Sequence, residues 1–156
     1  AAGAKMFVQT AIFGGKFGEA APTSMYSPNY AGLPRELTLE EIWRIIEDFG
    51  QAARRAREVG YDGVEIHGCH GYLIGQFISP AMNKRTDEFG GSFEKRMKFP
   101  LEIYRAMREQ VGDDFPLGFK MSAWEDLEAA SKVVRRRFAS PSEWLTRGWR
   151  MCMSAR

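Results

Sequence analysis

Cysteine and histidine are scarce in this chain of 156 residues, which contains two of each. The two cysteines, Cys69 and Cys152, cannot form a disulfide framework, and such sparse use is typical of the reducing cytoplasm. No apolar run approaches the roughly 20 residues that cross a bilayer. The first residues also lack the charged and apolar regions of a signal peptide. The sequence therefore predicts a cytoplasmic protein without a membrane segment.

An excess of one charge is missing as well, because 22 lysines and arginines face 20 aspartates and glutamates. A net charge of +2 gives no basis for binding nucleic acid or an anionic membrane. There is no P-loop, no CxxC pair, and no G-x-G-x-x-G after a strand, which argues against a Rossmann unit. An apolar content of 44% is that of a globular domain with a core.

The order of apolar segments indicates the fold. We predict strands over 5–10, 62–66 and 116–122, and helices over about 38–59, 72–78 and 92–111. Thr38 and Glu41 have the spacing of a capping box, Gly60 suits a helix end, and Ser92 suits an N-cap. Strands that alternate with long helices predict right-handed βαβ units and a parallel sheet. A complete (β/α)8 barrel needs about 200 residues or more. We therefore expect an α/β chain that forms part of such a TIM barrel, with about three βα units.

Two loops stand out. The segment 14–34 is long for a compact domain, and such loops often carry function. The polar loop 81–91 and the helix after it contain Arg85, Asp87, Glu94 and Arg96. We expect these four residues to form a structural network of ion pairs.

Both histidines lie in residues 64–72, which read Val-Glu-Ile-His67-Gly-Cys-His70-Gly-Tyr72. Glycines break the predicted strand here, so His67, His70 and Tyr72 fall at a strand end, where parallel α/β folds place their chemistry. The histidines could instead be satisfied polar groups. They could also bind a metal ion with Cys69, but no further Cys or His lies nearby to complete a tetrahedral zinc site, so no metal is expected.

A longer stretch resembles a known family. Gly60-Tyr-Asp-Gly-Val-Glu-Ile-His67 runs on through His70-Gly-Tyr72 to Asn83-Lys-Arg85-Thr-Asp87-Glu-Phe-Gly-Gly-Ser92. It resembles the old yellow enzymes, FMN-dependent ene-reductases that include the 2,4-dienoyl-CoA reductases, over about residues 4–125. The resemblance implies a (β/α)8 barrel that holds FMN at the C-terminal ends of its strands. NADH or NADPH would reduce the flavin, which would pass hydride to an alkene activated by a carbonyl group. It further implies a small-molecule substrate and a whole protein that forms homo-oligomers.

The resemblance also implies roles for five residues. His67 and His70 would bind the substrate's carbonyl oxygen, and Tyr72 would deliver a proton to the α-carbon. Gln9 would contact the flavin ring, and Lys120 would lie near its pyrimidine edge. Two donors aimed at an oxygen that gains negative charge favour the transition state, and a tyrosine with a pKa near 10 can act as an acid. Alternatively, Tyr72 only covers the core, Gln9 is an ordinary strand-end amide, and Lys120 is a surface lysine.

The chain departs from the family at three places. Lys120 stands where the family usually has arginine, which keeps the charge but loses the planar fork. Residues 12–16 replace a His-x-Gly-Arg pattern, which puts substrate choice in question. Phe89 replaces a common tyrosine, and we expect its role to be structural.

The resemblance stops after about Glu128, so we predict a partial FMN-binding barrel domain over 1–128 and an atypical tail over 129–156. Residues 148–155 resemble no barrel strand. In a shifted reading frame their codons can encode Val-Glu-Asp-Val-His-Val-Ser, which resembles the family's next strand. We therefore expect a frameshift near residues 128–140; the alternative is a genuine divergent tail.

These inferences predict an FMN-dependent oxidoreductase of the ene-reductase type, here as an incomplete chain. One alternative is another TIM-barrel oxidoreductase that uses the same two histidines on a carbonyl substrate. The other is an inactive fragment or interaction module. Because a partial barrel leaves sheet edges open, we expect the isolated chain to bind FMN weakly or not at all.

Overall fold

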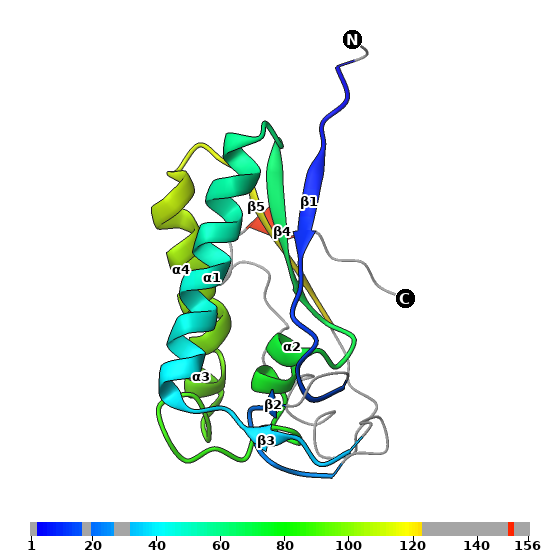
Figure 1. Cartoon of the computed structure of the whole chain (residues 1–156), viewed down its shortest axis with the longest axis vertical. Helices are drawn as coiled ribbons and strands as arrows, with labels where there is room; N and C mark the ends of the chain where they lie inside the picture. Colours follow the sequence, from blue (N-terminus) through cyan, green and yellow to red (C-terminus); the bar gives the residue numbers. More distant parts are fainter. Residues whose placement is uncertain (1–2, 17–19, 27–31, 123–149, 152–156) are drawn as a thin grey trace.

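A computed structural model of the chain describes residues 3–16, 20–26, 32–122 and 150–151. Its main sheet has the order β1-β4-β5-β6, and every neighbouring pair is parallel (Figure 1). The strands are β1 (Phe7–Thr10), β4 (Gly63–Gly68), β5 (Leu117–Met121) and β6 (Arg150–Met151). The three strands predicted from the sequence are thus confirmed, as is their parallel arrangement.

The short strand β6 corrects the expectation that residues 148–155 hold no barrel strand. Arg150 and Met151 pair in parallel with Gly118 and Phe119 of β5. Pairing uses only backbone N–H and C=O groups, which every residue except proline supplies, so a side-chain pattern did not reveal it. The rest of the tail lies outside the described residues, and the predicted domain boundary and frameshift stay predictions.

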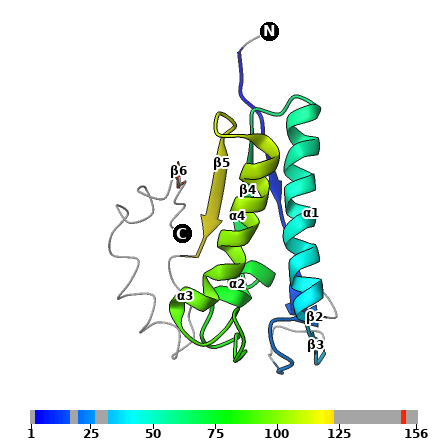
Figure 2. The same ribbon diagram turned by 90° about the vertical axis from the view of Figure 1, so that its left-hand side faces the viewer.

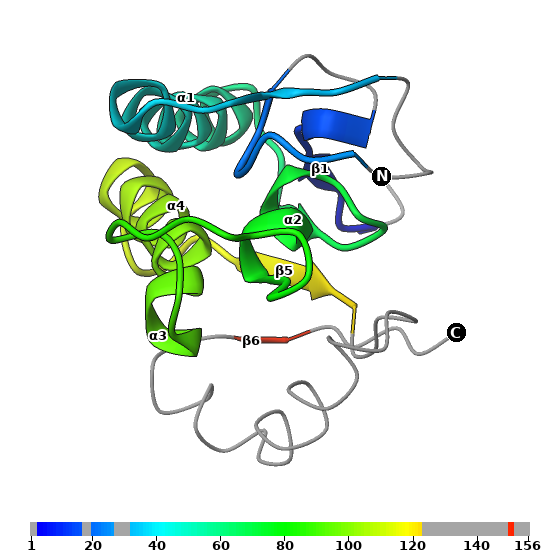
Figure 3. The same cartoon turned by 90° about the horizontal axis from the view of Figure 1, so that it is seen from below.

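Two long helices, α1 (Leu39–Glu58) and α4 (Lys98–Val111), lie side by side against one face of the sheet (Figures 1 and 2). Seen from below, they are stacked on one side of the strands (Figure 3). They approach closely at Gly50, where an added Cβ would lie 3.0 Å from the Ala106 carbonyl oxygen. Apolar residues of both helices and the sheet fill the core between them: Ile42, Ile46, Phe49, Ala53, Val64, Ile66, Ile103, Met107, Val111, Leu117 and Phe119.

The ends of α1 follow the sequence signals. The Glu41 N–H donates to Thr38 Oγ1 at 3.2 Å, and the Thr38 N–H donates to Glu41 Oε2 at 2.9 Å, so the predicted capping box is present. Gly60 follows the helix with φ +91°, a left-handed conformation that glycine adopts without steric cost. Among the described residues, no helix is both long and apolar enough to cross a membrane.

The prediction of a single helix over 92–111 is wrong. The structure has a short helix α3 (Phe93–Arg96), a break at Met97, and then α4. Pro100 explains the break: in one continuous helix its ring would clash with the carbonyl of Arg96, whereas a proline is tolerated in the first turn of a new helix. Ser92 does cap α3, because its hydroxyl accepts the Lys95 N–H at 3.4 Å.

The long loop predicted over 14–34 contains unexpected structure. It includes a 3-10 turn η1 (Gly14–Lys16) and a strand β2 (Ala20–Ala21), which pairs in parallel with β3 (Arg35–Glu36). These elements and α2 (Leu73–Ile78) lie at one end of the molecule (Figure 1).

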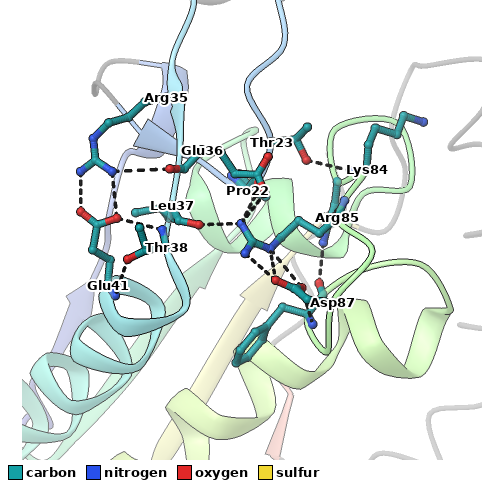
Figure 4. Close-up of polar contacts among 12 residues, drawn as sticks. Pro22, Thr23, Arg35, Glu36, Leu37, Thr38, Glu41, Lys84, Arg85 and Asp87 are labelled. Atoms are coloured by element: carbon teal, nitrogen blue, oxygen red, sulfur yellow. Dashed lines mark hydrogen bonds and ion pairs between the residues drawn. The ribbon is translucent and has the colours of Figure 1, made fainter.

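Arg85 joins these loops through an arginine cluster of Glu36, Arg85 and Asp87 (Figure 4). Its guanidinium donates to the carbonyl oxygens of Pro22 at 2.9 Å and Leu37 at 2.7 Å, and contacts Asp87 at 2.5 Å. The Arg85 side chain is only 4% exposed. The expected ion pair of Arg85 with Asp87 is therefore confirmed, with Glu36 as an unexpected partner. Arg96 instead donates to the carbonyl oxygens of Ile78, at 2.9 Å, and Gly91.

Phe89, the residue that replaces a common family tyrosine, lies in the same end of the core. It is fully buried, and its ring meets those of Phe77 and Phe99 with centroids 6.3 Å and 6.4 Å away. This position agrees with the structural role expected for it.

Candidate active site

The backbone turns sharply after β4, and this turn holds the predicted site residues. His70 has φ +58° and Gly71 has φ +69°, so two successive residues are left-handed. A histidine in this conformation is uncommon, and such strain gathers at functional sites. The Tyr72 N–H donates to the Cys69 carbonyl at 3.2 Å, and the buried Gln76 amide donates to the Gly71 carbonyl at 2.7 Å. These bonds hold the turn in place.

The turn brings His67, His70 and Tyr72 together as a ring cluster. The His67 ring centroid lies 5.0 Å from that of His70 and 5.0 Å from that of Tyr72. His70 and Tyr72 are 6.4 Å apart and nearly perpendicular. His67 is buried, Tyr72 is partly buried, and His70 is exposed. The three residues singled out in the sequence are thus neighbours, while their roles remain predictions.

Gln9 determines how His67 carries its proton. The Gln9 Nε2 donates to the carboxylate of Glu65, its partner in the β1–β4 register. The Gln9 carbonyl oxygen then faces His67 and lies 2.8 Å from Nδ1. An oxygen can only accept there, so Nδ1 carries the proton and Nε2 of the neutral ring keeps its lone pair. That Nε2 lies 3.5 Å from the Cys69 sulfur.

The surroundings of this pair favour neutral side chains. Burial lowers the pKa of His67 below its usual value, and the positive charges of His70 and Lys120 lower it further, against the opposing charge of Glu65. Burial likewise raises the pKa of the Cys69 thiol. At neutral pH the arrangement therefore holds a neutral imidazole beside a protonated thiol.

Lys120 lies beside His67, because these two residues are paired in the β4–β5 register. Gln9, His67 and Lys120 thus come from three adjacent parallel strands, near their C-terminal ends. An amide and an ammonium group are the kinds of group that can hydrogen-bond the carbonyl and N–H edge of an isoalloxazine, although Glu65 and His67 engage both polar groups of the Gln9 amide in this structure. The chemistry of these side chains is compatible with the flavin expected from the sequence, while the contacts of Gln9 with its ring and of Lys120 with its pyrimidine edge remain predictions.

Phe13 belongs to residues 12–16, the segment that departs from the family pattern, but the sequence predicted no role for Phe13 itself. Its ring meets the Tyr72 ring edge-to-face, with centroids 5.0 Å apart at 89°. The backbone beside it is anchored, since the Leu73 N–H donates to the Ile12 carbonyl at 3.1 Å. Through Phe13, the segment that departs from the family pattern therefore contacts the ring cluster at Tyr72. Its place directly after the first strand was the signal that could have identified it.

Comparison with known proteins gives matches of sequence and structure. The sequence profile of the NADH:flavin oxidoreductase / NADH oxidase family matches residues 1–147. An NADH oxidase of Thermoanaerobacter brockii is 55% identical over 100 residues, which is 64% of this chain and 15% of that protein. The 12-oxophytodienoate reductase 2 of Arabidopsis thaliana is 52% identical over 93 residues, which is 60% of this chain and 25% of that protein.

A solved old yellow enzyme homologue from Zymomonas mobilis superposes with a TM-score of 0.76 at 28% identity. The match covers 87% of this chain and 43% of that structure. The chain thus spans less than half the length of these relatives.

Proposed function

Because the chain belongs to the NADH:flavin oxidoreductase / NADH oxidase family, we propose that it supplies the substrate-activating part of an FMN-dependent ene-reductase. The observation that carries this proposal is the ring cluster beside Gln9 and Lys120, at the C-terminal ends of three parallel strands. Bound FMN, reduced by NADH or NADPH, supplies hydride to a carbon–carbon double bond. The partial barrel predicted from the sequence agrees with the superposition on an old yellow enzyme.

The substrate class follows from what the rings can do. Hydride addition to an alkene conjugated with a carbonyl places negative charge on the oxygen, and donors fixed around that oxygen lower the barrier. His70 and His67 are these donors in our proposal, and Tyr72 gives the proton to the α-carbon. The name of the Arabidopsis relative describes a reductase of an oxo-dienoate, which supports a carbonyl-activated alkene as the small-molecule substrate.

The protonation of His67 adds a condition. While Nδ1 donates to Gln9, the neutral ring has no proton on Nε2 to offer a substrate. Rotation of the Gln9 amide away from the ring would free Nδ1 and let the proton reside on Nε2. In our proposal, the orientation of Gln9 therefore decides whether His67 can act as the second donor. We place the reaction in the cytoplasm, which the sparse cysteines favour.

A chimera tests the proposal. Residues 4–122 replace the matching segment of an old yellow enzyme of known structure, which restores a complete barrel. We expect the chimera to bind FMN and to oxidise NAD(P)H only when an α,β-unsaturated ketone is present. Tyr72→Phe should lower kcat by about 100-fold or more without loss of flavin, because a general acid contributes roughly that much. Tyr104→Phe on the distant helix α4 is the matched control and should leave kcat unchanged.

Two results would contradict the proposal. A chimera that holds flavin but reduces no activated alkene would remove the substrate class. A Tyr72→Phe variant with full activity would remove the proton donor. For the isolated chain, we propose weak FMN binding or none, because it supplies donors from only part of a barrel; tight stoichiometric binding in equilibrium dialysis would contradict this.

A further inference from the structure

We propose that His67, Cys69 and His70 form a binding site for a divalent cation of the zinc class, with one coordination position left for a solvent oxygen. The ligand atoms that these three side chains offer all lie within 4.8 Å of one another. Imidazole nitrogen and thiolate sulfur are the donors that zinc prefers, and three protein ligands with an open fourth position are typical of reactive zinc sites. The inference does not depend on the proposed function, but it uses the same two histidines. A ring nitrogen that binds the ion has no proton to donate, so the ion would compete with that donor role.

The distances suit such an ion. Zinc–sulfur bonds of about 2.3 Å and zinc–nitrogen bonds of about 2.1 Å place tetrahedral ligand atoms roughly 3.5 Å apart. The Cys69 Sγ and His67 Nε2 are already 3.5 Å apart. The ligand atoms of the three side chains lie within 4.8 Å of one another, and His70 is the exposed member of the group. A movement of its ring on the order of 1 Å would bring its nitrogen to the tetrahedral separation from the other two ligand atoms.

Gln9 prepares His67 for this role. Its carbonyl oxygen accepts from Nδ1 at 2.8 Å, which leaves the lone pair on Nε2, the nitrogen nearer the Cys69 sulfur. Metal-binding histidines commonly donate their other N–H to such a partner, which fixes the ring and its tautomer. Burial also keeps the His67 ring neutral, so few protons compete for Nε2.

Two features oppose the ion, and they limit its affinity. Cys69 is a buried thiol, so it must release its proton when the metal binds. The positive charge of Lys120 acts on both His67 and Cys69 and repels a cation. The carboxylate of Glu65 acts on the same two groups with the opposite sign and partly offsets that repulsion.

Cobalt titration of the purified 156-residue chain tests the site, because Co²⁺ reports thiolate ligation by a charge-transfer band. We expect this band to saturate at one equivalent, Zn²⁺ to abolish it by displacement, and binding to release protons. Cys69→Ser should remove the band and weaken Zn²⁺ binding at least about tenfold. Loss of a residue that only hydrogen-bonds to a metal ligand already weakens binding about 10- to 100-fold, and Cys69 would be a ligand itself. Cys152→Ser is the matched thiol control and should change neither.

Two further variants separate the site from loss of folding. His70→Ala should weaken Zn²⁺ binding while circular dichroism stays unchanged. Gln9→Ala should keep the band but weaken binding about 10- to 100-fold, because it removes only the orienting partner. A folded chain with no thiolate band, or a band that follows Cys152 and not Cys69, would overturn the proposal. Flavin is absent from these experiments, so their failure is distinct from that of the proposed function.

Discussion

The arginine cluster and the ring cluster both gather polar side chains, but they are stabilised in different ways. Carbonyl and carboxylate oxygens from three segments surround the Arg85 guanidinium, with its carbonyl contacts at 2.7 Å and 2.9 Å (Figure 4). The ring cluster instead rests on ring contacts and on a turn with two left-handed residues. The first arrangement holds loops together, whereas the second stores strain to present side chains, which is typical of a site.

The largest expected effect is on the arginine cluster. Arg85→Met should destabilise the chain by about 3–5 kcal/mol, because it leaves buried oxygens without their cation. Arg35→Met removes an exposed partner of Glu41 and should cost no more than about 1 kcal/mol. Urea unfolding measures both. If the two variants lose equal stability, the buried cluster is not the anchor that its contacts indicate.

Strain in the turn gives the next effect. Gly71→Ala should cost about 1–2 kcal/mol, because alanine resists the left-handed conformation although its Cβ would meet no atom within 4 Å. His70→Gly should leave stability unchanged or raise it by up to about 1 kcal/mol, since it relieves the same strain. Thermal unfolding compares them. A large loss of stability in His70→Gly would make the ring cluster structural.

The contact of Phe13 with the ring cluster should contribute less to the free energy of unfolding. Phe13→Ala removes the edge-to-face contact with Tyr72 and should cost about 0.5–1.5 kcal/mol. Tyr26→Ala removes an aromatic ring that is 73% exposed and is the control. Urea unfolding of both variants should show a loss only for Phe13. Equal values would mean that Phe13 is not packed on Tyr72 in solution.

The smallest effect is the response of the α1 cap to acid. The Arg35 hydrogen bond, with help from the Thr38 backbone, lowers the pKa of Glu41 to about 2. Because the folded pKa lies below the unfolded one, the stabilisation is present above about pH 4.5 and is lost as the pH falls through about 2. Glu41→Gln should flatten this part of the acid-unfolding curve. An unchanged curve would contradict the assignment.

Local signals made much of the fold predictable. Thr38 and Glu41 cap α1 through contacts three residues apart, and the apolar spacing that buries Ile42 and Ile46 is visible within one helix. The break at Met97 also has a local signal, Pro100, but the continuous apolar spacing over 92–111 led to the prediction of one helix. The pairings of β2 with β3 and of β5 with β6 join distant backbone segments, which leave little trace in a sequence.

The site divides in the same way. His67, His70 and Tyr72 were predicted because they share one strand end within six residues of sequence. Phe13 and Gln76 were missed because each reaches the turn from another element. The proton position on His67 also depends on a partner 58 residues away, Gln9, whose amide is oriented by Glu65 on the neighbouring strand.

The alternation of strands and helices, the capped ends of α1 and the family of the chain could all be predicted from the order of its amino acids. These features depend on side-chain periodicity and on contacts between residues a few positions apart, so their signals lie close together along the chain. Three contacts could be seen only in the folded chain: Gln9 faces His67, Cys69 lies beside the Nε2 of that histidine, and Arg85 binds the Pro22 and Leu37 carbonyl oxygens. Hydrogen bonds act over about 3 Å in space, whatever the separation along the chain.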